Sequence, residues 1–267
     1  MATRRNLLLP DVARWPRDEP VIVLENVTKA FGPKQVLKGL SLSVEAGKTT
    51  VIAGQSGSGK SVLLRMMNAL TLPDSGTVRL FGCDLAKAGE RERTELRKRC
   101  TMVFQNYALI DSLTVAENIG FPLAENTRMR RAEIRKLVAE LLALLELSHA
   151  IDAMPASLSG GMKKRVSLAR AVISNPEVVL FDEPTTGLDP VIKAVIDGLI
   201  LELQEGLGST ALVITHDLDS AFRIADRIAF LYRGRIVANA PPQEFRDLPD
   251  PRVQQFIQGL ATGPLTD

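Results

Sequence analysis

One short segment constrains the fold of this chain more than any other: GQSGSGKS, which runs from Gly54 to Ser61. It fits the pattern G-x-x-x-x-G-K-[ST], whose glycines allow backbone N–H groups to turn inward around phosphates. The loop follows TTVIA, which is typical of a buried strand, and precedes VLLRMMNAL, which is apolar almost all round like a helix beneath a sheet. A chance glycine loop seldom lies between two such neighbours, so the segment predicts a nucleotide-binding site.

The residues of this loop have distinct expected roles. Lys60 is expected to reach the β- and γ-phosphates, and the hydroxyl of Ser61 is expected to bind Mg²⁺. The dipole of the following helix favours negative charge at its start. The residues expected to surround the phosphates are Gly54, Gln55, Ser56, Gly57, Ser58, Gly59, Lys60 and Ser61.

Strand and helix patterns alternate around this loop. Short apolar or alternating runs occur at CTMVF, EVVLFDE, TALVIT, RIAFLY and RIVA, with helical patterns after Pro190 and His216. This alternation predicts an α/β fold with a mainly parallel sheet covered on both faces. VIVLENV and VLKGLSLSV, which precede the loop, predict a small antiparallel layer, and the helical periodicity between Arg91 and Leu147 predicts an inserted helical subdomain.

Polar side chains follow the predicted core strands. Asp182 ends the apolar run VVLFD and is expected to hold Mg²⁺, while Glu183 is expected to polarise the attacking water. A surface carboxylate is the alternative for a lone glutamate. His216 follows TALVIT at the edge where ligands of such sheets collect, and is expected to sense the γ-phosphate. Gln105 follows CTMVF, and its amide is expected to contact metal and water without adding charge.

A second helix start with anion-binding chemistry lies far along the chain, in LSGGMKKRVSLAR. Ser159, Gly160 and Gly161 place a hydroxyl and bare N–H groups at this start, as the first loop does. One γ-phosphate can satisfy both helix starts only if both surround it. The basic run Lys163–Arg165 that follows is more typical of a solvated helix face, and we expect no binding role for it.

Taken together, these motifs resemble the nucleotide-binding subunit of an ABC transporter, in order over roughly 21–238. GQSGSGKS matches Walker A, Gln105 the Q-loop, LSGGM the signature, VVLFDE Walker B, GLD the D-loop that ends at Asp189, and His216 the switch histidine. The resemblance implies two copies arranged head to tail, with ATP between the Walker loop of one and the signature of the other. It also implies that Phe31 stacks on adenine, although an early core aromatic is the alternative.

Three further sequence segments are similar to those of the ATPases of Mla- or Mce-type phospholipid transporters: ALIDSLTVAENIGFPL, LSGGMKKRVSLARA and DPRVQQFIQG. Amino-acid importers share most of the core motifs, but Met162, where many relatives carry glutamine, and the tail favour the lipid family. The resemblance implies ATP and Mg²⁺ as cofactors and a homodimer beneath a multispanning permease (MlaE-like). A periplasmic Mce-domain lipid-binding protein (MlaD-like) and a small STAS-domain subunit (MlaB-like) are further implied partners. The chain would lie at the cytoplasmic face of the inner membrane, bound through the permease.

The segment after the Q-loop is apolar where exposure would be costly. The resemblance implies that this segment meets the transmembrane partner, so Tyr107, Leu109 and Ile110 are expected to help line the groove that takes a permease helix.

Domain boundaries follow from these matches. Residues 1–19 carry prolines and mixed charges without periodicity, which predicts a flexible extension in which Trp15 is a docking aromatic. Residues 20–240 form the predicted ATPase domain, with the helical subdomain at approximately 90–172. Residues 241–267 form a predicted tail with a short amphipathic helix.

The tail helix has clear start signals. Asp250 is its expected N-cap, and Pro251 its first residue. Val253, Phe256 and Ile257 share one face, which we expect to pack on a neighbouring subunit, because so short a helix is marginal in water.

Composition limits the competing functions. Lysine plus arginine number 33 against 31 aspartates plus glutamates, which excludes the strong basic excess of a nucleic-acid binder. Cys83 and Cys100 lack metal-ligand spacing, so reduced thiols are expected. A soluble ABC protein acting on ribosomes or DNA ends is the alternative from another class. Such proteins usually carry two ATP domains or a coiled-coil insertion, whereas this chain has one Walker loop.

Overall fold

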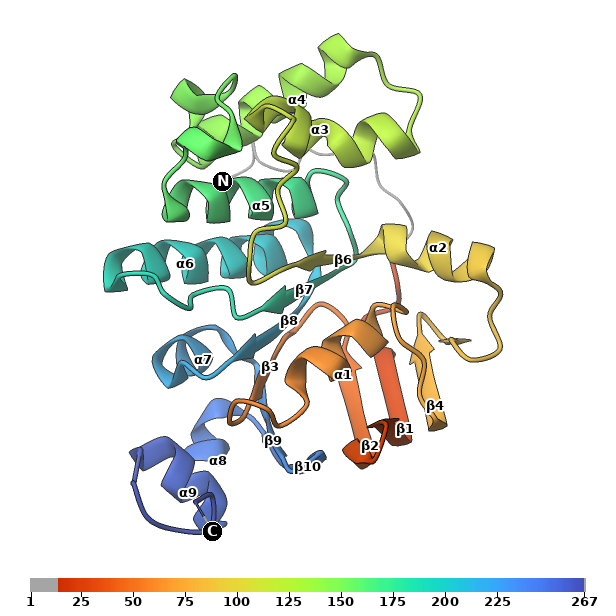
Figure 1. Cartoon of the computed structure of the whole chain (residues 1–267), viewed down its shortest axis with the longest axis vertical. Helices are drawn as coiled ribbons and strands as arrows, with labels where there is room; N and C mark the ends of the chain where they lie inside the picture. Colours follow the sequence, from red (N-terminus) through yellow and green to blue (C-terminus); the bar gives the residue numbers. More distant parts are fainter. Residues whose placement is uncertain (1–13, 267) are drawn as a thin grey trace.

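The computed structural model describes residues 14–266, in which a helical layer lies above two sheets (Figure 1). The larger sheet has the strand order β10-β9-β3-β8-β7-β6, and every neighbouring pair is parallel except β9 and β10. Its strands are β3 (Thr49–Ala53), β6 (Cys100–Val103), β7 (Val178–Asp182), β8 (Thr210–Thr215), β9 (Arg227–Tyr232) and β10 (Arg235–Ala240).

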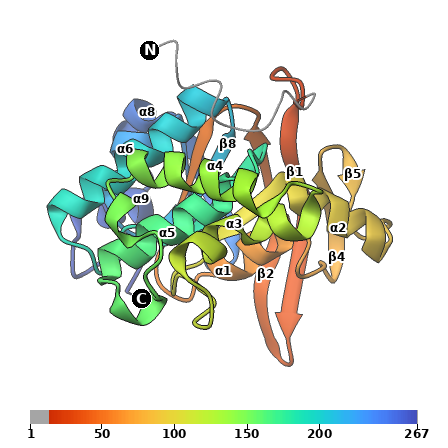
Figure 2. The same cartoon turned by 90° about the horizontal axis from the view of Figure 1, so that it is seen from above.

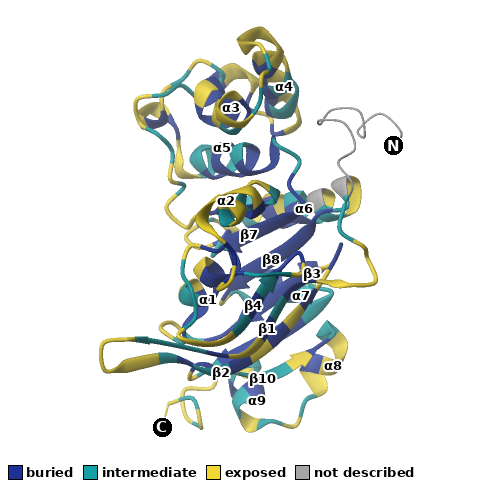
Figure 3. Ribbon diagram, turned by 90° about the vertical axis from the view of Figure 1, so that its right-hand side faces the viewer, coloured by how far each residue is buried: buried dark blue, intermediate teal, exposed yellow. Residues whose placement is uncertain are grey.

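The register of the larger sheet brings the expected functional segments to one edge. Ala53 pairs with Thr215, and Asp182 pairs with Ile214, so β3, β8 and β7 end side by side. These strands are almost wholly buried, as Figure 3 shows, because helices cover both faces. The carboxyl edge of such a sheet is where ligands of α/β folds bind.

The smaller sheet is antiparallel, in the order β2-β1-β4-β5, so the expected antiparallel layer is confirmed. Its strands are β1 (Pro20–Phe31), β2 (Lys34–Glu45), β4 (Ser75–Leu80) and β5 (Cys83–Asp84). The sequence did not predict β4, which begins with Ser75 and Gly76. Gly76 has a φ of 82°, and an added Cβ would lie 2.5 Å from the carbonyl oxygen of Asn26, so only glycine allows β1 to pass this closely.

Helix α1 (Lys60–Met67) follows the glycine loop and lies between the two sheets (Figure 1). Its side chains Leu63, Leu64, Met66 and Met67 are fully buried, as its nearly uniform apolar pattern predicted. The other helices packed around the sheets are α2 (Glu90–Arg99), α6 (Pro190–Leu207) and α7 (Leu218–Ile224).

The helical layer has its own core. It contains α3 (Val115–Asn126), α4 (Arg131–Leu144) and α5 (Gly160–Val172), with short 3₁₀ turns at Ser148–Ala150 and Pro155–Ser157. Figure 2 shows the three helices together on the near side of the molecule, with the antiparallel sheet to one side. The buried side chains that join them are Val115, Ile119, Leu123, Ile134, Val138, Leu142, Val166 and Ile173. No helix within residues 14–266 combines the length and apolar character needed to cross a bilayer.

The tail differs from its prediction. Helices α8 (Pro242–Asp247) and α9 (Pro251–Gln258) pack on the chain's own sheet. Val253 is fully buried, and the ring of Phe256 lies 4.8 Å from that of Phe230 on β9. The expectation that this face packs on a neighbouring subunit is therefore wrong, because β9 offers an apolar surface in the same chain.

The first segment of the chain also has partners. Residues 1–13, where flexibility was expected, lie outside the described residues. In 14–19 the expected flexibility gives way to packing. The main-chain N–H of Trp15 donates to Glu177 Oε2 at 2.6 Å, and the Trp15 ring meets the Phe81 ring edge-on with centroids 6.0 Å apart. Trp15 thus docks on the fold, because Glu177 accepts its hydrogen bond and Phe81 provides an apolar contact for its ring.

Candidate functional site

The glycine loop joins β3 to α1 and depends on its glycines. Gly54 has a φ of 157°, and an added Cβ would lie 2.4 Å from the carbonyl oxygen of Leu231. Gly59, with a φ of 109°, is the N-cap of α1 and provides no side-chain cap. Within residues 14–266 no side chain caps the first N–H groups of α1, and uncapped N–H groups of this kind bind phosphate at a helix start.

Lys60 is held over this loop from the first turn of α1. It is 7% exposed, and its Nζ donates to the carbonyl oxygens of Gly54 at 2.7 Å and Gln55 at 3.0 Å. The same Nζ lies 3.9 Å from Glu183 Oε1. Burial lowers the pKa of Lys60, while Glu183 and Asp182 oppose that shift. The loop therefore contains a preplaced buried cation facing two carboxylates.

Asp182 and Ser61 form an oxygen pair suited to Mg²⁺. Ser61 Oγ donates to Asp182 Oδ1 at 3.5 Å. Burial raises the pKa of Asp182, and the neighbouring Glu183 raises it further, so a cation here would relieve a real electrostatic cost. Mg²⁺ usually takes one or two protein oxygens and completes its shell with water and phosphate.

A further polar atom of the loop fits a phosphate. The Oγ of Ser58 is buried and has no hydrogen-bond partner within residues 14–266. A buried hydroxyl without a partner costs free energy, and a phosphate oxygen between the loop amides would supply that partner. The residues present therefore fit a bound nucleoside triphosphate and its metal ion.

Glu183 is the centre of the site. Its φ is 50°, a left-handed conformation that is costly for a residue other than glycine. Its Oε2 lies 2.8 Å from His216 Nδ1 and accepts a hydrogen bond from Thr186 Oγ1 at 2.9 Å. The structure thus brings together Glu183, His216 and Lys60, which the sequence had placed at three strand ends. Sequence reasoning missed Thr186, since a threonine in the TTGLD loop gives no chemical signal by itself.

Lys164 contradicts its sequence interpretation. The basic run Lys163–Arg165 was expected to be a solvated face, but Lys164 is 3% exposed. Its Nζ donates to the main-chain carbonyl oxygen of Glu183 at 3.3 Å and lies 5.6 Å from the ring centroid of Tyr107. Burial lowers the pKa of Lys164 to about 8, although Asp182 and Glu183 oppose the shift. The charge pattern of the sequence could not predict the burial of Lys164, because that burial depends on how α5 packs on neighbouring segments.

The signature segment forms the start of α5. Ser159 is the N-cap, and its Oγ accepts a hydrogen bond from the Met162 N–H at 3.3 Å. Ser159 and Gly160 are exposed. Among the described residues, no hydrogen bond or ion pair joins Ser159, Gly160 or Gly161 to the group around Lys60. Within one chain the two anion-binding helix starts are therefore not joined.

Three other residues that the sequence predicted to contact the nucleotide lie outside the group around Glu183. Phe31 ends β1 and is 52% exposed, which excludes the alternative of a core aromatic, and the Nζ of Lys29 lies 5.7 Å from its ring. Gln105 is exposed just beyond β6, and its side chain forms no hydrogen bond within residues 14–266. Asp189 is the N-cap of α6 and accepts hydrogen bonds from Val191 N and Ile192 N.

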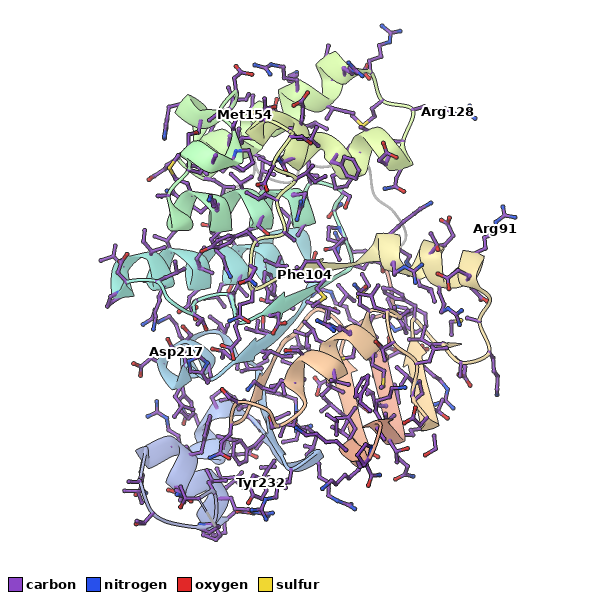
Figure 4. All side chains as sticks on the ribbon, viewed as in Figure 1. Arg91, Phe104, Arg128, Met154, Asp217 and Tyr232 are labelled. Atoms are coloured by element: carbon purple, nitrogen blue, oxygen red, sulfur yellow. The ribbon has the colours of Figure 1, made fainter. Side chains whose placement is uncertain are left out.

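The segment after Gln105 is anchored to the signature helix. The carbonyl oxygen of Tyr107 accepts hydrogen bonds from Ser167 Oγ at 2.9 Å and Arg170 Nη2 at 3.1 Å. Figure 4 places Phe104, just before this segment, between the helical layer and the sheet. Leu109 is half-buried and packs on the core of the helical layer. The groove that this segment was expected to line stays a prediction.

Comparisons with known proteins agree with this geometry. Residues 37–186 match the family described as ABC transporter. The chain is 36% identical to the intermembrane phospholipid transport system ATP-binding protein MlaF of Haemophilus influenzae, over 93% of this chain and 94% of that protein. It is 35% identical to the "Probable ribonucleotide transport ATP-binding protein mkl" of Mycobacterium tuberculosis, over 91% of this chain and 68% of that protein.

A solved structure has the same fold. It is the dimeric, post-hydrolysis state of the ATP-binding cassette MJ0796 bound to ADP and phosphate. The TM-score is 0.77 at 34% identity, covering 83% of this chain and 98% of that one.

Proposed function

This chain belongs to the ABC transporter family as an ATP-hydrolysing, ATP-binding subunit, and from that premise we propose that it powers phospholipid transport between two membranes. The observation that carries the hydrolytic part is the group around Glu183, in which a carboxylate, a histidine and a buried lysine converge at one sheet edge. The similarity to MlaF, which spans nearly the whole of both chains, supports the lipid substrate.

The side chains around Glu183 divide the chemistry of hydrolysis. Lys60 and the N–H groups at the start of α1 would hold the phosphates, and Ser61 and Asp182, with Gln105, would hold Mg²⁺. The metal supplies charge neutralisation at the phosphates when it is bound. Glu183 accepts a proton from the attacking water, whose oxygen bonds to the γ-phosphorus as the bond to ADP breaks.

His216 and Thr186 serve the base rather than the phosphate alone. Both lie within hydrogen-bond distance of Glu183 Oε2, so they fix the direction of the carboxylate. The side chain of His216 is 55% exposed, which leaves its other ring nitrogen accessible to a γ-phosphate. A base held in this orientation needs less reorganisation when it accepts the proton.

We propose that the working unit is a homodimer in which each signature closes on the nucleotide of the other copy. The exposed start of α5 supports this arrangement, because it has anion-binding chemistry and, within residues 14–266, no contact with the phosphate-binding loop. The dimeric state of MJ0796 with ADP and phosphate is consistent with it. Phe31, exposed at the end of β1, would stack on the adenine.

The permease side of the proposal rests on relatives. A multispanning permease of the MlaE type would bind beside the Q-loop segment, with MlaD-like and MlaB-like subunits as further partners. The chain would then lie peripherally on the inner membrane. Purification from native membranes tests this part: a co-purifying multispanning permease supports it, and co-purifying ribosomal RNA contradicts it. Lipid analysis after depletion of the chain then separates phospholipid transport from nucleotide or amino-acid transport.

Glu183→Gln tests the catalytic assignment. We expect ATP turnover by the assembled complex to fall by at least about a hundredfold, because the amide cannot accept the proton. ATP binding should survive, since Lys60 and the loop amides are untouched. Glu25→Gln, which removes an exposed carboxylate on β1, is the control. Turnover that persists in Glu183→Gln would remove this residue from the role of base.

A further inference from the structure

The main chain of Glu183 is fixed as tightly as its carboxylate. Its N–H donates to the carbonyl oxygen of Ile214 at 2.9 Å, and its own carbonyl oxygen accepts from Lys164 Nζ at 3.3 Å and from the Thr186 N–H at 3.4 Å. The left-handed φ of 50° persists only where surrounding contacts outweigh its cost. Lys164 is the one charged donor among these contacts, and charged donors form the stronger hydrogen bonds.

Packing alone does not explain a lysine at this position. Lys164 lies on α5 and is 3% exposed as a residue, and burying a charge is costly unless it is paired. A methionine of similar length would fill the same space without that cost. The ammonium faces the strand end that carries Asp182 and Glu183, whose charges partly offset its burial. The charge therefore has an electrostatic reason to be at the catalytic strand end.

The position of Lys164 on α5 adds a second reason. Ser167 and Arg170 on the same helix hold the carbonyl oxygen of Tyr107, and the ring of Tyr107 lies 5.6 Å from the Lys164 ammonium. Tyr107 also has a left-handed φ, 60°. One helix thus braces two strained backbone positions, one beside the Q-loop and one at Glu183.

We propose that Lys164 is a positioning residue for ATP hydrolysis: from the signature helix, its ammonium holds the main chain of Glu183 in the left-handed conformation that aims the carboxylate. This inference rests on the proposed role of Glu183 as the base. Lys164 itself is not placed against nucleotide or metal. Its loss should therefore affect the chemical step and leave nucleotide binding unchanged.

Lys164→Met in the full chain, assembled with its permease, tests the proposal. We expect kcat for ATP to fall between about tenfold and a hundredfold, because small misplacement of a catalytic group costs this much. KM and the affinity for ATP should stay within twofold of the parent. The melting temperature should be unchanged or higher, since replacing a buried charge by an apolar side chain of similar volume is often neutral or stabilising. Lys164→Arg, which keeps a charged donor, should recover part of kcat.

Lys163→Met is the matched control. Lys163 is half-buried on the same turn of α5, and its side chain forms no hydrogen bond or ion pair within the described part of the chain. Lys163→Met removes the same charge from α5. Equal losses of kcat in Lys163→Met and Lys164→Met would therefore assign the effect to the overall charge of the helix and overturn the proposal. A kcat within twofold of the parent in Lys164→Met would overturn it too, as would a loss matched by lower stability. Glu183→Gln, assayed in parallel, separates these results from failure of the base assignment, which would leave that variant active.

Discussion

The molecule has two helix starts with the same anion-binding chemistry and opposite surroundings. At the start of α1, Lys60 is buried and faces Asp182 and Glu183. At the start of α5, Ser159 and Gly160 are exposed, and among the described residues the Ser159 hydroxyl bonds only to the Met162 N–H of its own helix. The first helix start is surrounded by the catalytic groups of its own chain, whereas the second presents its donors outward.

This difference explains how one chain can contain two half-sites. The groups of the first are joined by contacts across β3, β7 and β8, so we expect a single copy to bind nucleotide. In the proposed homodimer, the second start gains a phosphate when another copy supplies it. Helix α5 still reaches its own catalytic centre through Lys164, which bonds to the carbonyl oxygen of Glu183. The signature helix is therefore exposed at its start and bound to the end of β7 through Lys164.

The largest expected effect is at the first helix start. Lys60→Met removes the buried ammonium that would bind the β- and γ-phosphates, so we expect the affinity for ATP to fall on the order of a hundredfold. Isothermal titration with ATP and Mg²⁺ measures it. Lys48→Met, which removes an exposed lysine just before β3, is the control and should bind as the parent does. Binding retained in Lys60→Met would mean that the backbone loop alone provides the affinity.

A smaller effect, on a different quantity, is expected at the second helix start. Gly160→Asp places a carboxylate where the γ-phosphate of the partner is expected, and the two negative charges repel. ATP binding to a single copy should stay within twofold, while the dissociation constant of the ATP-bound dimer should rise at least about tenfold. Analytical ultracentrifugation in the Glu183→Gln background, where ATP is not consumed, measures that constant.

Gly160→Ala provides the matched control for this experiment. An added Cβ at Gly160 would lie 3.3 Å from the hydroxyl of Tyr107, the end of a flexible side chain that can move slightly. This variant should therefore dimerise nearly as well as the parent. Equal losses in Gly160→Ala and Gly160→Asp would point to crowding rather than charge, and an unaffected Gly160→Asp dimer would remove the signature from the nucleotide interface.

The sequence predicted the parts of the fold that depend on local pattern. The glycine loop, the apolar strands and the ABC family follow from residue order, and the comparisons confirm the family and the fold. It could not predict the contacts made by chain segments far apart. Phe256 was expected to need a neighbouring subunit because its partner, Phe230, becomes its neighbour only through the fold.

Lys164 shows the same limit within the site. Its neighbours in sequence are charged, and a charged run is usually solvated, yet tertiary packing turns one of its members toward Glu183. Thr186 is similar, because its hydroxyl matters only through the direction of one carboxylate. Patterns thus predicted the groups that we propose to carry the chemistry, while the groups that position them depend on three-dimensional contacts.

The smallest expected effect concerns a contact between the C-terminal tail and the glycine loop that precedes α1. Gln55 Nε2 of the glycine loop donates to the carbonyl oxygen of Leu265 at 3.3 Å, and the Tyr232 hydroxyl anchors the same tail segment through the carbonyl oxygen of Pro264 at 2.8 Å. Figure 4 shows Tyr232 beside the tail. Deleting residues 261–267 removes both contacts, and we expect the affinity for ATP to fall by about two- to fivefold, the value of one ordinary hydrogen bond.

The dimer constant at saturating ATP should not change in this deletion, because the contacts lie on the loop and not on the signature. Tyr232→Phe loosens the anchor while keeping the Leu265 carbonyl in the chain, so its effect on ATP affinity should be smaller than that of the deletion. Titration with ATP, followed by sedimentation, compares the two quantities. A deletion that weakens the dimer but spares ATP binding would reverse the assignment, and would place the tail with the second helix start rather than the first.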